Sequence, residues 1–264
     1  LSHGLPLHLA AGVGGWFLLT GMGVGYKLLS MFVLAPEERG KLGKSVLLLT
    51  CVGLFLFWVA SLLMLFSWTT PFTGILLWAK RCGGLVLLGG LWVYLVDMGR
   101  LYHTRKRRKL ELNGRFGAWA LFALGIGVAL LVAAAITRWS TPLLTAAFYL
   151  LLMGYLTGLG LSQLYKIVPF LSWLQRFGPK VGRESVPRVQ DLVDEPQATP
   201  WFVAYFVAVG LGTLAMIFDW DPLFRGVEAA NALITLAIGV FLQRARHAQP
   251  KLGERPKPVV KAQA

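Results

Sequence analysis

The stretch HTRKRRKLELNGRFGAWALFALGIGVALLVAAAITR, residues 103–138, decides the fold class of this chain. It opens with a cluster of basic residues and continues into residues 116–137, which carry no charged side chain. A run of about 20 apolar residues crosses the hydrocarbon core of a bilayer as a helix, which rises about 1.5 Å per residue. The stretch therefore predicts a membrane-spanning helix that begins just after a basic loop.

Further apolar runs of similar length lie on both sides of this one. Their residues do not alternate with a period of two, which argues against the strands of a membrane barrel. The predicted spans cover residues 8–34, 45–67, 82–102, 116–137, 143–165, 201–219 and 224–243. We therefore expect an all-α, polytopic transmembrane helical bundle of about seven spans over residues 1–245. It has a cytoplasmic loop at 166–199 and is followed by a disordered, Pro- and Lys-rich cytoplasmic tail at 246–264.

The composition agrees with a membrane protein. Of the 264 residues 56% are hydrophobic and 14% are charged, whereas a soluble domain carries about 25% charged residues. The net charge of +14 would suggest nucleic acid as a partner if the basic residues lined one soluble face. They flank the apolar spans instead, which favours a lipid bilayer with anionic headgroups as the partner and argues against nucleic acid.

The basic residues fall almost entirely into every second gap between spans. The gaps at 35–44, 100–115 and 166–199, together with the chain from 244 onward, hold 21 of the 26 Lys and Arg residues. By the positive-inside rule these segments are cytoplasmic, with the N-terminus outside and the C-terminus inside a bacterial inner (plasma) membrane. An outside N-terminus without a signal pattern predicts preceding helices or other membrane subunits.

Glycine pairs predict close packing between helices. Gly21 and Gly25 lie four residues apart in the first predicted span, and Gly154 and Gly158 repeat this spacing in the fifth. A side chain of one hydrogen lets a neighbouring helix approach closely. We interpret both pairs as contacts within the bundle and not as ligand contacts.

Histidine is scarce in this chain. His103 lies in the basic loop and His247 in the predicted tail, where both should be solvated. His3 and His8 lie near the outer end of the first span, but a regular helix would point them about 140° apart. Both could bind one metal only if Pro6 interrupts the helix. By position alone, a lone interfacial histidine such as His8 is more often a boundary residue that forms hydrogen bonds than a metal ligand.

Four of the polar residues inside predicted spans are candidates for a site within the membrane, where burying a charge or amide is costly. Glu228 and Asn231 lie three residues apart on one face of the last span, near its outer end, and could form a proton or cation contact. Lys27 and Asp97 lie near the cytoplasmic ends of the first and third spans, where snorkelling and pairing account for them. The chain carries no nucleophile triad, phosphate-binding glycine loop or His-Glu-x-x-His motif, so no catalytic residue is assigned.

Two stretches resemble known proteins. In the first, Leu7-His8-Leu9 precedes the glycine-rich residues 12–15 and the sequence GVGYKLLSMF at 23–32. In the second, YKIVPFLSWL at 165–174 is followed by RFGP at 176–179. Both are similar to segments of uncharacterised bacterial membrane proteins related to haem-copper oxidase subunit I and to the nitric-oxide-response family NnrS. The resemblance covers most of this chain as the C-terminal part of a longer bundle.

This resemblance implies a haem or copper cofactor bound by a histidine near the outer third of a helix, and His8 fits that position. Preceding helices could supply further ligands, and the sulfur of Met22 or Met153 could act as a second axial ligand, although a methionine in a packed helix is usually a packing residue. An oxidase core uses several helix-borne histidines, so oxygen reduction by this chain alone is not expected. The resemblance implies instead a protein that binds or handles a redox metal or responds to nitric oxide, and we do not expect this chain by itself to be an enzyme.

Two other functions remain open. A small-solute transporter or permease would use Glu228, Asn231 and the glycine-rich helices to line its path. A non-catalytic assembly subunit of a membrane complex would hold no ligand of its own. A bound chromophore, solute uptake and co-purifying subunits are the observations that separate these three functions.

Overall fold

The computed structural model describes residues 4–35, 40–66, 72–137 and 139–248. Within these ranges the regular elements are helices, and no strand forms. Seven helical segments are long and apolar enough to cross a membrane: Leu7–Val33, Leu42–Phe66, Thr73–His103, Leu112–Ile136, Thr141–Lys180, Glu195–Ile217 and Asp221–His247. The predicted all-α bundle is therefore confirmed, and its seven long helices fit a multi-pass membrane protein.

Two of the spans contain π-helical segments. The first consists of α1 (Gly4–Leu9), the π-helix η1 (Ala10–Leu18) and α2 (Leu19–Val33). The fifth consists of α6 (Thr141–Tyr149), the π-helix η2 (Leu150–Thr157) and α7 (Gly158–Phe177), and the short 3-10 helix η3 (Gly178–Lys180) extends it. The π-helical turn is wider than an α-helical turn, and π-helical segments occur frequently at functional sites.

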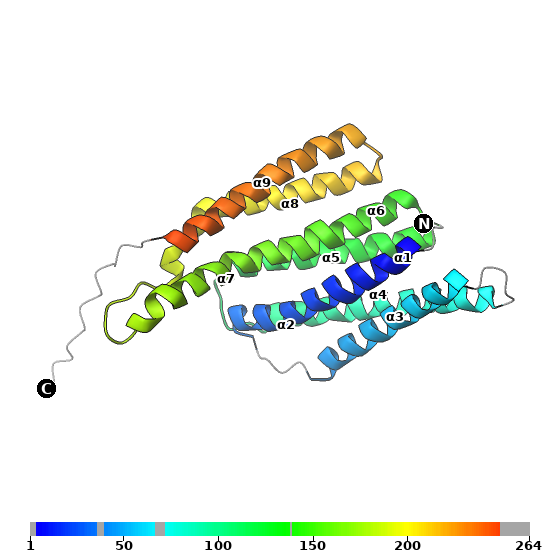
Figure 1. Ribbon diagram of the computed structural model, residues 1–264, viewed down its shortest axis with the longest axis horizontal. Coiled ribbons are helices and arrows are strands. Elements are labelled where there is room, and N and C mark those ends of the chain that lie inside the picture. The colour runs from blue at the N-terminus through cyan, green and yellow to red at the C-terminus, as the bar shows by residue number, and fades with distance from the viewer. Residues whose placement is uncertain (1–3, 36–39, 67–71, 138, 249–264) are drawn as a thin grey trace.

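In the rest of the bundle, helices that follow one another in the sequence pack against each other. α3 (Gly40–Phe66) lies along α4 (Thr73–His103), and α8 (Glu195–Ile217) lies along α9 (Asp221–His247) (Figure 1). α5 (Leu112–Ile136) packs against the α6–η2–α7 span between these two pairs. The bundle is thus built from antiparallel helix pairs, with the fifth span near its centre.

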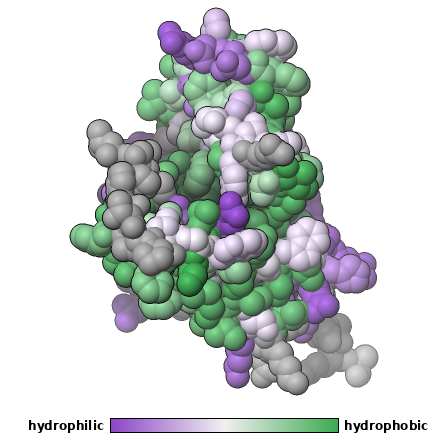
Figure 2. Space-filling view, turned by 90° about the vertical axis from the view of Figure 1, so that its right-hand side faces the viewer, coloured by the Kyte–Doolittle hydropathy of each residue, from purple (hydrophilic) through white to green (hydrophobic). Residues whose placement is uncertain are grey.

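The connections alternate between the two ends of the bundle. The α5–α6 and α8–α9 turns lie at one end, and the α4–α5 and α7–α8 connections lie at the other, together with the last residues of α2 and α9 (Figure 1). Most described basic residues thus gather at a single end. Figure 2 looks onto the opposite end, where apolar and weakly polar side chains dominate and strongly hydrophilic ones form only small patches.

α4 begins at Thr73, earlier than the predicted start at residue 82. The predicted span was too short because the residues before it include Gly74 and end in Lys80 and Arg81, a composition typical of a segment at the membrane interface. The Lys80 ammonium lies 5.0 Å from the centre of the Phe57 ring, and the Arg81 guanidinium lies 5.5 Å from that of Trp78. Both cations are therefore placed over aromatic faces while the backbone stays helical.

α7 continues through Pro169 to Phe177. Membrane helices tolerate proline where neighbouring groups satisfy the freed backbone, and Pro169 is buried against the bundle. The non-helical connection is consequently shorter than the predicted loop at 166–199, and it contains the 3-10 helix η4 (Val189–Leu192). At the other end of the sequence α9 includes His247, while the rest of the predicted tail, residues 249–264, lies outside the described residues.

Large apolar side chains cover the outside of the helices. Phe122 is 71% exposed and Ile136 is 77% exposed, whereas the tyrosines Tyr94, Tyr155 and Tyr205 are fully buried. Apolar side chains such as Leu29 and Leu112 also fill the core, so the feature that fits a membrane protein is the large apolar side chains on the outer surface. This distribution places the phenolic hydroxyls inside the bundle and apolar surface where lipid would contact it.

The predicted glycine contacts are confirmed. A Cβ atom on Gly25 would lie 2.7 Å from the Tyr94 hydroxyl, and one on Gly158 would lie 2.8 Å from the Phe206 ring. The closest backbone approach joins α3 and α4, where a Cβ on Gly53 would lie 2.4 Å from the Leu87 nitrogen. Because that neighbour is a backbone atom, a larger residue at position 53 would force α3 and α4 apart.

Candidate functional site

The predicted metal ligands do not converge in the described part of the chain. His8 lies on α1 with an exposed side chain, and His3 lies outside the described residues. Met22 lies in α2, about 20 Å further along the same helical rod, so it cannot share an ion with His8. Among the described residues no three His, Cys, Asp or Glu side chains form a group that could hold a metal ion. Of the two predicted histidine ligands only His8 is among the described residues, and a haem iron can be held by a single protein histidine.

The predicted polar pair on α9 lies instead in a cluster of polar groups from three spans. The Tyr149 hydroxyl at the end of α6 donates a hydrogen bond to Glu228 Oε1 of α9. Gly212 of α8 borders this bond, since a Cβ there would lie 2.7 Å from Tyr149 Oη and 3.3 Å from Glu228 Oε1. The ring of Phe224 packs edge-on against Tyr149 at 5.7 Å between ring centres. The glycine therefore provides the space in which the phenol and the carboxyl group meet.

Asn231 is the most informative member of this cluster. Its side chain is 1% exposed, and neither Nδ2 nor Oδ1 has a hydrogen-bond partner among the described residues. An amide offers two N–H donors and one acceptor oxygen, and buried amides are nearly always satisfied by protein or by a bound molecule. Glu228 lies on the same helix three residues earlier, as predicted. The cluster therefore has free donor and acceptor capacity next to a carboxyl group.

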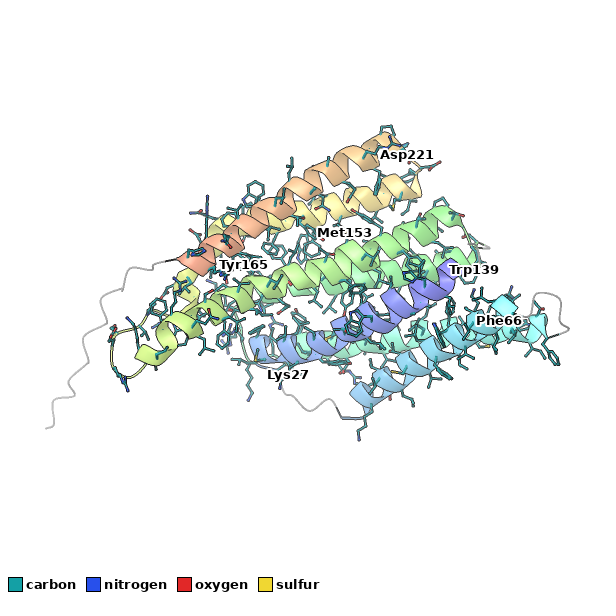
Figure 3. All side chains as sticks on the ribbon, in the orientation of Figure 1. Lys27, Phe66, Trp139, Met153, Tyr165 and Asp221 are labelled. Carbon is teal, nitrogen blue, oxygen red and sulfur yellow. The ribbon has the colours of Figure 1, made fainter. Side chains whose placement is uncertain are left out.

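The π-helix η2 faces this cluster. The Tyr205 hydroxyl of α8 donates to the backbone oxygen of Met153 at 2.7 Å, and Figure 3 labels Met153 where the fifth span faces α8 and α9. Thr157 Oγ1 donates to the Leu152 oxygen, five residues earlier, at 2.8 Å. Side chains thus satisfy backbone oxygens that the wider π-helical turn leaves accessible. We call the set Tyr149, Tyr205, Glu228 and Asn231, with the Met153 oxygen, the outer polar cluster.

The other two predicted polar residues, Lys27 and Asp97, lie in α2 and α4, and only Asp97 belongs to a buried polar group. The Tyr26 hydroxyl donates to Asp97 Oδ2 at 2.9 Å, and Asp97 is 5% exposed. The Tyr155 hydroxyl of η2 donates to the Tyr94 hydroxyl at 3.0 Å, and the Tyr26 and Tyr94 ring centres lie 5.3 Å apart. Lys27 is exposed, and its side chain projects away from the helices in Figure 3. Asp97 is thus stabilised by a phenol in the bundle interior.

The tyrosines are the functional candidates that the sequence pattern did not identify. Tyr149, Tyr155 and Tyr205 lie within apolar runs and contribute to them as hydrophobic residues. A signal for them exists, because a tyrosine buried in a span needs a partner for its hydroxyl. That rule predicts a polar contact but does not say which helix supplies it. Asn113 and Gln163, both buried, also carry unpartnered amide atoms in the described structure.

A network of ion pairs around Glu111 links α5, α7 and the neighbouring loops at the basic end of the bundle. Glu111, between α4 and α5, pairs with Arg107 and with Lys166 of α7, whose Nζ lies 2.5 Å from Glu111 Oε2, and it accepts a hydrogen bond of 2.8 Å from Gln190. Burial by itself would raise the pKa of Glu111, but the hydrogen bond and charge of Lys166, the Gln190 hydrogen bond and the Arg107 charge together lower that pKa below its usual value.

The outer polar cluster is therefore the candidate functional site, because it combines a carboxyl group, two phenols and an unsatisfied amide at membrane depth. The carboxyl group and the amide come from α9, and the two phenols come from α6 and α8. The missing side chain at Gly212 leaves space for the Tyr149–Glu228 hydrogen bond. No known protein family, curated protein or solved structure shows a significant match to this chain.

Proposed function

We propose that this chain is a membrane transporter or permease that carries a small cation, a proton included, and that the outer polar cluster binds it. The observation that carries the proposal is Asn231, a fully buried amide with both polar atoms unpartnered, beside the Tyr149–Glu228 hydrogen bond. Ionisable side chains inside spans are costly to keep, so they mark ion or proton paths.

The donor set determines the class of ligand. The carboxylate of Glu228, the amide oxygen of Asn231 and the Tyr149 phenol are all oxygen donors, which suit hard cations better than soft metals. Transporters also use backbone oxygens of irregular helices to coordinate sodium ions or protons. In this chain the η2 segment, whose Met153 oxygen already accepts a hydrogen bond, would supply such oxygens.

We further propose that the basic end faces the cytoplasm of a bacterial inner membrane, with the N-terminus of the chain outside and the C-terminus inside. The support for this orientation is the gathering of Lys and Arg at one end, as the positive-inside rule requires. Glu228 then lies in the outer half of the bilayer. A cation would reach the cluster from the outside over a shorter distance than from the cytoplasm.

Transport by reconstituted protein tests this proposal. Proteoliposomes would be loaded with a pH-sensitive dye and assayed for uptake of radioactive sodium under an imposed potential. The chain should move sodium ions or protons faster than empty liposomes, and Glu228→Gln should reduce the rate at least about tenfold. Glu184→Gln, which removes an exposed carboxylate at the other end, is the control and should leave the rate unchanged. Fluxes no faster than those of empty liposomes, or insensitive to Glu228→Gln, would rule the proposal out.

A haem- or copper-associated function, either handling a redox metal or responding to nitric oxide, is the second candidate. One observation favours it: the His8 side chain is exposed, at the point where α1 gives way to η1, and is accessible to a ligand-bearing helix of another subunit. Purified protein from metal-replete cells should then show a Soret band or bound copper, and His8→Ala should remove it. Retention of the signal in His8→Ala, or a colourless and metal-free protein, would contradict this candidate. Co-purifying subunits with no ligand would favour an assembly role.

A further inference from the structure

A basic cavity lies at the cytoplasm-assigned end of the bundle, away from the outer polar cluster. It is open to the surface and has a volume of about 660 Å³ between the loop after α4 and the first turns of α5 and α8. Its lining combines basic residues with the start of α8: Arg105, Arg108, Lys109, Leu110, Arg115, Glu195, Pro196, Thr199 and Pro200. Four of these side chains are cations and one is an anion, so the cavity carries an excess of positive charge.

The single acidic residue of the cavity does not neutralise this charge. Glu195 Oε2 accepts a hydrogen bond from the Leu112 backbone at 3.2 Å and lies 3.8 Å from the Arg115 guanidinium. Arg115 also donates to Thr199 Oγ1 at 3.2 Å. Arg108 and Lys109 form no ion pair with any residue that the structure describes. Their charges therefore remain available to an anion.

Arg105 supplies an independent indication of a ligand. One guanidinium nitrogen donates to the Tyr102 backbone oxygen, while Nε is buried and has no hydrogen-bond partner within the described ranges. A buried N–H of a cation without an acceptor is costly. The loop around it is held in place, because the backbone nitrogens of Lys106 and Arg107 donate to the last residues of α2 at 3.2 and 3.3 Å. The unpartnered donor is thus part of a preformed site.

Exposed aromatic side chains follow two of the cavity's lining residues, Arg115 and Pro200, along their helices. Arg115, Trp119 and Phe122 lie on one face of α5 at helical spacing, and Trp119 and Phe122 are exposed. Trp201 of α8 is exposed beside Pro200, at the cavity wall. Exposed tryptophans of this kind sit at the level of lipid headgroups. A headgroup in the cavity would have its acyl chains along the aromatic face of α5.

We propose that this cavity binds the phosphate group of an anionic phospholipid. Its cations and the N-terminal ends of α5 and α8 contact the phosphodiester, since helix N-termini and guanidinium groups both favour such anions. The exposed Trp119 and Phe122 on α5 would contact the acyl chains of a lipid, which favours a lipid over a soluble phosphate. This site is independent of the proposed transport function, and its failure would leave that proposal unaffected.

The lipid that stays bound to the extracted protein tests whether the cavity binds an anionic headgroup. The full chain would be incorporated into vesicles of equal phosphatidylglycerol and phosphatidylcholine, extracted, and examined by native mass spectrometry for bound lipid. Phosphatidylglycerol should be retained preferentially, and Arg108→Gln with Lys109→Gln should weaken its binding by about 10- to 30-fold. The matched control is Lys180→Gln with Arg183→Gln, which removes two exposed cations from the same end outside the cavity.

Three results would overturn the proposal. Equal retention of the two lipids would show that the cavity does not recognise an anionic headgroup. Equal losses in the cavity variant and in the control variant would show general surface attraction. Displacement of phosphatidylglycerol by inorganic phosphate at millimolar concentration would assign the cavity to a soluble anion. Arg105→Gln provides a second variant. It should bind phosphatidylglycerol more weakly than the unmodified chain, whereas the control variant should bind this lipid as the unmodified chain does.

Discussion

Tyr149 and Glu228 are joined by a hydrogen bond that crosses from α6 to α9 over the backbone of Gly212 in α8. The contact depends on the absence of a side chain at position 212. A phenol, a carboxyl group and a glycine therefore hold α6 beside the consecutive helices α8 and α9.

The first prediction concerns this glycine. Gly212→Ala places a Cβ within 2.7 Å of the Tyr149 hydroxyl, so either the bond breaks or α8 shifts. We expect a loss of about 1 to 3 kcal/mol in the free energy of unfolding, the usual cost of overpacking. Gly210→Ala, two residues earlier on the same helix, has no atom within 4 Å of its new Cβ and serves as the control. Unfolding in detergent, followed by circular dichroism, measures both; equal stabilities would contradict the close contact.

A second prediction separates function from stability at Asn231. Replacing the amide by Leu removes two unpartnered polar atoms from a buried position, so Asn231→Leu should leave stability unchanged or raise it by about 1 kcal/mol. The same variant should lose cation transport, because the amide oxygen is gone. Ala232→Leu adds the same side chain at an exposed neighbour and should transport normally. If Asn231→Leu is strongly destabilised, the amide has a structural role.

The third prediction concerns the buried carboxyl group of α4. Tyr26→Phe removes the hydroxyl that donates to Asp97 at 2.9 Å, and leaves a charged or polar group with one hydrogen bond fewer. We expect a loss of about 1 to 3 kcal/mol in unfolding free energy. A double-mutant cycle with Asp97→Asn should recover a coupling energy between the two positions. Additive losses in the cycle would mean that the bond contributes nothing.

The fourth prediction is a pH dependence at the basic end. The neighbouring cations and Gln190 hold the pKa of Glu111 below its usual 4.5 in the folded protein, so the network stabilises the fold only while Glu111 is ionised. That contribution is present above about pH 4.5 and is lost as the pH falls through the lowered pKa. Glu111→Gln should therefore flatten the acid limb of the stability profile measured by thermal unfolding. Glu184→Gln, on an exposed pair, should retain the wild-type limb.

Much of the fold follows from the sequence, and the remaining differences have physical causes. Apolar runs about as long as a bilayer is thick predict the spans, because helix rise and hydrocarbon thickness fix their length. The start of α4 was missed because the composition of residues 68–81 is typical of a segment lying at the membrane interface, whereas the backbone is helical from Thr73 onward. The continuation of α7 through Pro169 was missed because proline interrupts helices in water more often than in a packed membrane bundle.

The candidate site was predictable only in part. Glu228 and Asn231 were identified because polar residues in spans are rare, and their spacing of three placed them on one face. Tyr149 and Tyr205 were not, since a tyrosine in an apolar run has the periodicity of any core residue. The pairing itself depends on which helices become neighbours. Helical periodicity carries no information about contacts between residues 79 positions apart.

The fifth span has a mechanical consequence. The continuous rod Thr141–Lys180 contains 40 residues and is about 60 Å long, roughly twice the thickness of a hydrocarbon core. It carries η2 beside the outer polar cluster and, further along, Lys166 in its ion pair with Glu111. Unlike a loop, an unbroken helix transmits rotation and axial displacement along its length. A rotation or axial displacement of this helix at one membrane face would thus also move its residues at the opposite face.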